Sequence, residues 1–189
     1  MAIVSVPDLG IVLSETGEVQ KYLAGIGLDY ETWPVLDLPA DASAETILDS
    51  YRQDIERIKV RGGYTSVDVV NVYSSTPGLD EMLARFNREH WHDEDEVRFT
   101  VAGSGMFHIH PKNGAVVAVE VLPGDLIRVP RGTHHWFNLC RSREIKVIRF
   151  FQDRSGWTPH YTGAATAEKY EPVCFGPAYF LGFDDRIQK

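Results

Sequence analysis

Apolar and polar residues follow two different periods along the chain. Before residue 89, apolar positions recur at helical spacing, as at Val19, Tyr22 and Leu23. This pattern predicts three helices, over residues 15–26, about 43–60 and 79–88. Short runs rich in β-branched residues predict strands over residues 2–6 and 65–74.

From residue 89 onwards, short β-rich segments separated by glycine and proline turns replace the helical pattern. They read EVRFTVAG, GMFHIH, AVVAVEV, GDLIRVP, HHWFNL and EIKVIRFF. Many short strands with turns between them are typical of an antiparallel barrel or jelly roll. We therefore predict a mainly β fold in one domain over 1–189. It would have an N-terminal strand and helices in 1–65 packed outside, a barrel in 66–155, and a C-terminal tail in 156–189 packed on the barrel.

The composition narrows the possible partners. The 189 residues are 43% hydrophobic and carry a formal net charge of -8, which argues against nucleic acid and anionic membranes as partners. No apolar run reaches the roughly 20 residues of a membrane span, and the N-terminus MAIVSVPDLG does not resemble a signal peptide. Cys140 and Cys174 have no zinc-type spacing. One disulfide between them is formally possible, but we predict two reduced thiols in a cytoplasmic protein.

The segment EHWHDEDEVR (89–98) contains a candidate metal site. In an extended strand, His90 and His92 share a face, and Glu96 keeps that parity if the acidic turn preserves the register. Two imidazoles and a carboxylate suit a divalent transition metal. Glu94 lies on the same face as Glu96, so strand alternation alone does not decide which of them is the ligand. The alternative to a metal site is a solvated acidic turn with surface histidines.

A second segment, GDLIRVPRGTHHWFN (124–138), strengthens the metal hypothesis. This segment has a glycine turn, a strand and a Pro-Arg-Gly turn, followed by His134 and His135. In a barrel, such a unit can place one of these histidines beside the ligands of the first segment. The alternative is a hairpin with surface histidines, but the two patterns together favour a metal site. We interpret His108 and His110 as an exposed strand end, and His160 as a hydrogen-bonded polar residue near the tail.

The two segments together resemble the paired metal motifs of the cupin superfamily. The first motif is His90-x-His92-x3-Glu96-x6-Gly103, and the second is Gly124-x5-Pro130-x-Gly132-x2-His135. EHWHDEDEVRFTVAGSGMFHI and PGDLIRVPRGTHHWF are similar to the acireductone dioxygenases, over roughly residues 86–160. The resemblance implies a cupin-type antiparallel β-barrel and, as metal ligands, His90, His92, Glu96 and His135. The spacing after Gly132 selects His135 over His134.

The resemblance also implies a reaction. One Fe(II) or Ni(II) per chain would serve the cleavage of the acireductone 1,2-dihydroxy-3-keto-5-methylthiopentene by O2, in methionine salvage. With Fe(II) the products would be 4-methylthio-2-oxobutanoate and formate. With Ni(II) they would be 3-methylthiopropanoate, formate and CO. The family further suggests a monomer.

Four more residues are candidates for the substrate cavity. Arg98 follows Glu96 by two positions, so it would point into the same cavity and stabilise an anionic enediolate. Phe137 shares the parity of His135 and would form a wall. Arg149 and Trp157 resemble pocket residues of the family. The alternative for Arg149 is a surface residue of a strand, and the alternative for Trp157 is a core aromatic of the tail. Two other functions remain open: another cupin oxygenase or isomerase, and a non-catalytic metal-binding cupin.

Overall fold

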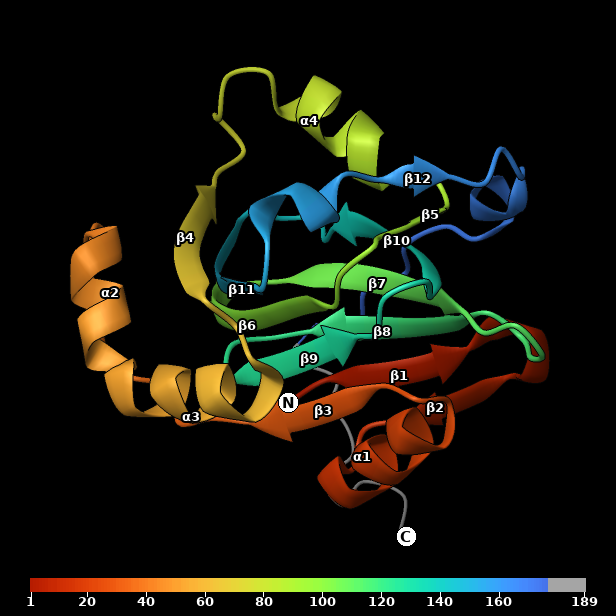
Figure 1. Cartoon of the computed structure of the whole chain (residues 1–189). Helices are drawn as coiled ribbons and strands as arrows, with labels where there is room; N and C mark the ends of the chain where they lie inside the picture. The colour runs from red at the N-terminus through yellow and green to blue at the C-terminus, as the bar shows by residue number, and fades with distance from the viewer. Residues whose placement is uncertain (177–189) are drawn as a thin grey trace, which may run out of the picture.

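Two antiparallel sheets form the centre of the computed structural model, which describes residues 1–176 (Figure 1). The seven-stranded sheet has the order β12-β5-β10-β7-β8-β1-β2, and the five-stranded sheet has the order β3-β9-β6-β11-β4. The strands are β1 Ile3–Val6, β2 Ile11–Leu13, β3 Asp29–Thr32, β4 Ser66–Val72, β5 His90–Trp91, β6 Glu96–Gly103, β7 Gly105–His110, β8 Val117–Val121, β9 Asp125–Val129, β10 His134–Leu139, β11 Ile145–Phe151 and β12 His160–Tyr161. The predicted mainly β, antiparallel fold is confirmed.

The α-helices lie outside the sheets (Figure 1). They are α1 Thr16–Gly25, α2 Ala44–Ser50, α3 Arg52–Gly62 and α4 Leu79–Phe86, and 3-10 turns cover Pro7–Leu9, Arg154–Trp157 and Thr166–Lys169. The single helix predicted over 43–60 is divided at Tyr51 into α2 and α3. The Ser50 hydroxyl donates to the Thr46 carbonyl at 2.7 Å, a bond that bends helices.

Two apolar clusters hold these layers together. One fills the space between the sheets and includes Phe107, Ile127 and Phe137. The other lies between the five-stranded sheet and α2–α3, where Phe99 and Phe150 contribute. Side chains alternate along β6, so its even-numbered residues face the interior between the sheets and its odd-numbered residues face the helices.

The chain after β11 crosses the outer face of the seven-stranded sheet. Tyr170 lies over Trp136, with ring centroids 6.1 Å apart. The backbone N–H groups of Phe175 and Gly176 donate to the buried carboxylate of Glu120 at 2.7 and 2.9 Å. Residues 156–176 of the predicted tail therefore contact the sheets, and residues 177–189 lie outside the described residues.

Cys140 and Cys174 form a disulfide, so the prediction of two reduced thiols is wrong. The segment that crosses the outer face brings Cys174 to the end of β10, where the two Cα atoms are 5.9 Å apart. A separation of 34 residues in the sequence gave no sign of this proximity. The bond fastens the C-terminal segment to the strand that carries His135.

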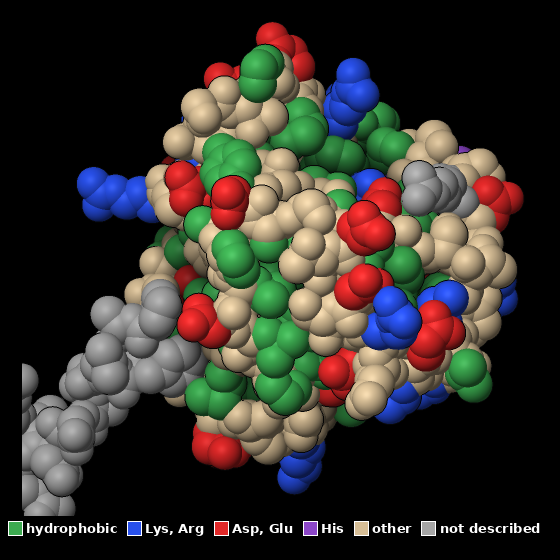
Figure 2. Space-filling model, turned by 90° about the vertical axis from the view of Figure 1, so that its left-hand side faces the viewer, with side chains coloured by type: hydrophobic (Ala, Val, Ile, Leu, Met, Phe, Trp, Pro, Cys, Tyr) green, Lys and Arg blue, Asp and Glu red, His purple; other side chains and the backbone are tan. Residues whose placement is uncertain are grey.

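The surface carries the acidic charge expected from the composition. Figure 2 shows acidic side chains spread over the face that lies on the left of Figure 1. Across residues 1–176, each helix is too short or too polar to pass through a lipid bilayer.

Candidate metal centre

Four buried side chains meet in the interior between the two sheets. They are His90, His92, Glu96 and His135, and each is at most 2% exposed. One ligand atom from each residue lies within 4.8 Å of all the others. His90 on β5 and His135 on β10 are directly paired, while Glu96 begins β6 in the other sheet. The structure thus brings the four predicted ligands together in an arrangement that can hold one metal ion.

The turn before β10 places His135 in this cluster. Gly132 has φ +75°, a backbone conformation that favours glycine, and its N–H donates to the carbonyl of His92 at 2.9 Å. The N–H of Arg131 donates to the Asp95 carboxylate at 3.0 Å. These two bonds join the glycine turn to the acidic turn, so they fix the two motifs against each other.

Backbone carbonyls orient all three imidazoles. The Nδ1 atoms of His90, His92 and His135 lie 2.6, 3.3 and 2.8 Å from the carbonyls of Arg88, Thr158 and Thr133. If each Nδ1 donates its proton, each Nε2 carries a free lone pair toward the centre of the cluster. This is the arrangement in which neutral histidines bind a metal.

Carboxylate and imidazole atoms crowd the centre of the cluster. Glu96 Oε2 lies 2.9 Å from His135 Nε2 and 3.2 Å from His92 Nε2. Within residues 1–176, the buried Nε2 atoms of His90 and His92 have no hydrogen-bond partner of good geometry. Buried polar atoms without partners are costly, and a metal ion bound to them would remove that cost. The donor set therefore fits a transition metal.

The electrostatics favour the deprotonated forms of His90 and Glu96. Burial, followed by the nearby His135, lowers the pKa of His90 to about 4. Burial alone would raise the pKa of Glu96, but the positive charge of Arg98 holds it well below the ordinary value. Neutral imidazole and ionised carboxylate are the forms that coordinate metals.

Arg98 lies beside the cluster among aromatic rings. Its Nη2 is 2.5 Å from Glu96 Oε1, and its guanidinium carbon lies 5.0 Å from the Phe137 ring centroid and 5.5 Å from that of Trp157. Arg149 lies 5.4 Å from the same Trp157 ring and binds Asp68 through two contacts of 2.9 and 2.8 Å. Phe137, Arg149 and Trp157, all candidates from the sequence, therefore surround or approach Arg98.

A mainly apolar cavity of about 280 Å³ opens from Arg98. It is lined by Val70, Val72, Met82, Leu83, Arg85, Phe86, Arg98, Phe137, Leu139, Ile145, Val147 and Arg149. Met82, Leu83 and Phe86 belong to the helix predicted over 79–88, but the sequence did not assign them to the cavity. Their position just before the His90 motif was the available signal.

The remaining polar candidates lie elsewhere. Glu94 accepts from the backbone N–H groups of Gln152 and Asp153, both at 3.2 Å, and His134 faces the outer side of its sheet, near Glu89. His160 lies 2.7 Å from Asp93, in agreement with a hydrogen-bonded polar residue.

The interpretation of His108 as part of an exposed strand end is wrong. It is 1% exposed and stacks on Trp136, with ring centroids 4.9 Å apart. The reason is that the C-terminal segment covers this part of the outer face, and Tyr170 lies 6.3 Å from the His108 ring.

Known proteins resemble this chain in sequence and in fold. The model of the ARD/ARD' family matches residues 16–159. The acireductone dioxygenase of Exiguobacterium sibiricum is 40% identical over 78% of this chain and 88% of its own length. That of Xylella fastidiosa strain 9a5c is 39% identical, over 87% of this chain and 88% of its own length. A solved acireductone dioxygenase from Bacillus anthracis, with a cadmium ion in its active centre, superposes with a TM-score of 0.81. It is 37% identical, over 85% of this chain and 98% of that chain. The chain therefore belongs to the ARD/ARD' family, and it is a dioxygenase with a cupin-type fold.

Proposed function

We propose that this chain cleaves the acireductone 1,2-dihydroxy-3-keto-5-methylthiopentene with O2, as a step of methionine salvage. The observation that carries the proposal is the position of Arg98 between the four-residue cluster and the apolar cavity. A small anionic substrate with an apolar tail needs a cation and an apolar cavity side by side. The names of the relatives support the same substrate.

We propose one Fe(II) or Ni(II) per chain, held by His90, His92, Glu96 and His135. Three imidazoles and one carboxylate suit these ions and would leave part of the coordination sphere for the substrate. The cadmium ion of the Bacillus anthracis relative supports a divalent ion at this place. When bound, the metal supplies Lewis-acid and redox chemistry for the reaction of the enediol with O2.

Arg98 binds and orients the enediolate in this proposal. Its guanidinium is largely buried, with 12% of the side chain exposed, and its Nε has no hydrogen-bond partner within residues 1–176. A fixed, desolvated cation stabilises negative charge more strongly than one in water. Because Arg98 also contacts Glu96, it would keep that carboxylate ionised as a ligand.

The apolar walls hold the rest of the substrate. Met82 and Phe86 of α4 and Phe137 of β10 bound the cavity and would contact the methylthio end. Exclusion of water by these walls would protect the reacting enediolate from side reactions. Trp157, which contacts both arginines, would close the polar end of the cavity.

The identity of the metal would decide the products. With Fe(II) we propose 4-methylthio-2-oxobutanoate and formate, and with Ni(II) we propose 3-methylthiopropanoate, formate and CO. Both atoms of O2 enter the products in either case. We further propose a cytoplasmic monomer. The net charge of -8 supports the absence of a nucleic-acid or anionic-membrane partner.

Reconstitution of metal-free protein with Fe(II) and with Ni(II) in separate samples tests the function. Oxygen uptake with the acireductone, followed by product analysis, is expected to give the two product sets above. Turnover of a different compound alone would instead indicate another cupin oxygenase or isomerase. Bound metal without turnover of any enediol would indicate a non-catalytic metal-binding protein.

A further inference from the structure

A second group of metal-ligand side chains lies on the outer face of the seven-stranded sheet. It consists of Glu89, His110 and His134. Glu89 Oε1 is 2.6 Å from His110 Nδ1 and 3.6 Å from His134 Nδ1. One ligand atom from each residue lies within 4.8 Å of the others, as in the central cluster. We call this group the outer cluster.

Strand alternation generates the outer cluster from the same segments that build the central one. Glu89 precedes His90 and His134 precedes His135, so each pair of neighbours sends one side chain to each face. His110 on β7 is directly paired with His134 on β10, which sets the two rings side by side. The two clusters therefore lie back to back across one sheet.

The donor chemistry of the outer cluster suits a metal ion. Both imidazoles present Nδ1 to the same carboxylate oxygen, whereas Thr162 Oγ1 donates to the other oxygen at 3.0 Å. The carboxylate of Glu89 lies 2.6 and 3.6 Å from its two imidazoles, and that of Glu96 in the central cluster lies 2.9 and 3.2 Å from His135 and His92. The spacing of the ligand atoms is therefore similar in the two clusters. Two imidazoles and a carboxylate form a set that zinc and its neighbours accept, with water in the remaining positions.

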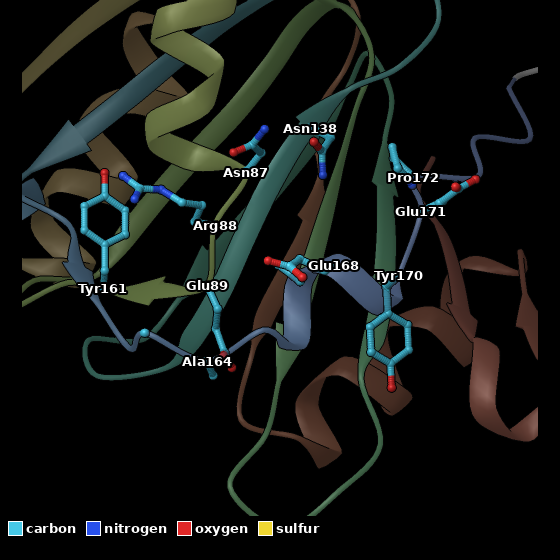
Figure 3. Close-up of a pocket in the computed structure, with 12 residues that line it drawn as sticks. Asn87, Arg88, Glu89, Asn138, Tyr161, Ala164, Glu168, Tyr170, Glu171 and Pro172 are labelled. Carbon is cyan, nitrogen blue, oxygen red and sulfur yellow. The ribbon is translucent and has the colours of Figure 1, made fainter.

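The outer cluster is accessible to solvent ions. The side chains of His110 and His134 are 35% and 44% exposed, while the carboxylate that anchors them is 2% exposed. Glu89 also lines an open cavity of about 540 Å³ between the end of α4 and the C-terminal segment. Figure 3 shows its side chain reaching toward the segment that carries Ala164. An ion can thus reach the cluster without any opening of the sheets.

We propose that Glu89, His110 and His134 bind one divalent transition-metal ion, such as Zn²⁺, independently of the central cluster. This site does not depend on the proposed reaction. The competing explanation is a hydrogen-bonded ion pair between Glu89 and His110 with no metal. The two explanations differ in what His110→Arg does, because arginine keeps the pair with Glu89 but does not ligate a metal.

Zn²⁺ binding to metal-free full-length protein at pH 7.5 tests the proposal. Equilibrium dialysis against buffered micromolar Zn²⁺ is expected to give two ions per wild-type chain and one in His110→Arg. His134→Ala, which removes a ligand at a half-exposed position, is also expected to bind one. His92→Ala is expected to keep the outer ion alone, and His92→Ala combined with His110→Arg to bind none.

His160→Ala is the matched control, since this exposed histidine contacts Asp93 and belongs to neither cluster. It is expected to bind two ions, like the wild type. Saturation of the wild type at one ion that His92→Ala abolishes would overturn the proposal. Two ions in both His110→Arg and His134→Ala would also overturn it, because the second ion would then bind elsewhere.

Discussion

His90 and His135 face each other across two antiparallel strands, with ring centroids 4.6 Å apart. Because their Nδ1 atoms are bonded to backbone carbonyls, the rings are oriented before any metal arrives. Such preorganisation lowers the entropic cost of binding an ion.

His135→Ala is expected to lose the central metal and the dioxygenase activity. Loss of a partner outside the ligand shell already lowers metal affinity roughly 10–100-fold, and loss of a ligand should exceed this. His134→Ala is the control, since the neighbouring side chain points to the outer face. Oxygen uptake checks both variants, because His134→Ala would also lose the ion of the outer cluster. Activity that only His134→Ala abolishes would identify His134 as the central ligand.

Arg98→Leu is expected to lower kcat by roughly 10²–10³-fold, the effect of removing one donor to a developing anion. Arg98→Lys should recover part of this, since it keeps the charge but not the planar fork. Measurement of the Ni(II) content distinguishes two causes of lost activity. Unchanged Ni(II) indicates a role of Arg98 toward the substrate, and reduced Ni(II) indicates an effect through its contact with Glu96. A variant that turns over at the wild-type rate would remove Arg98 from the mechanism.

Metal removal is expected to destabilise the fold. Four buried polar side chains without an ion carry a desolvation cost, and an ion at 1,000 times its Kd adds about 4 kcal/mol to the free energy of unfolding. For a chain of this length, each kcal/mol shifts Tm by roughly 2–4 °C. Thermal unfolding with and without a chelator measures the shift, which His92→Ala should reduce strongly. An equal shift in that variant would place the stabilising ion elsewhere.

Glu120 is expected to make stability depend on pH. Burial raises its pKa in the folded chain above the ordinary 4.5, despite the N–H donors of Phe175 and Gly176. As pH rises above about 4.5, the Glu120 carboxyl loses its proton in the unfolded chain but keeps it in the folded chain. The free energy of unfolding therefore falls as pH rises from about 4.5 to the raised pKa. Glu120→Gln should lack this loss. Tm of both proteins between pH 4 and 7 tests this, with the exposed Glu171→Gln as the control, and parallel pH profiles for wild type and Glu120→Gln would contradict it.

Most of the architecture was predictable because its period was clear. The six β-rich segments after residue 95 all became strands, since alternation and glycine turns marked them. The ligand residues His90 and His92 followed from parity on one strand. Glu96 could not be separated from Glu94 in this way, because the acidic turn between them sets the register and its conformation is a tertiary property.

Other features depended on contacts that no local pattern records. β2, β3, β5 and β12 have two to four residues each, too few to establish a period. The burial of His108 and the Cys140–Cys174 disulfide both result from the C-terminal segment, whose sequence has no clear periodicity. The contact between Arg98 and Glu96 likewise depends on side-chain packing rather than on spacing.

The bond from Gly132 to the His92 carbonyl has an evolutionary consequence. A one-residue insertion or deletion between that anchor and β10 would exchange the two faces of the strand, sending His134 inward and His135 outward. A histidine would still enter the interior, but Phe137 would leave it and Trp136 would take its place. The length of this short connection should therefore resist change far more than the identity of the residues within it.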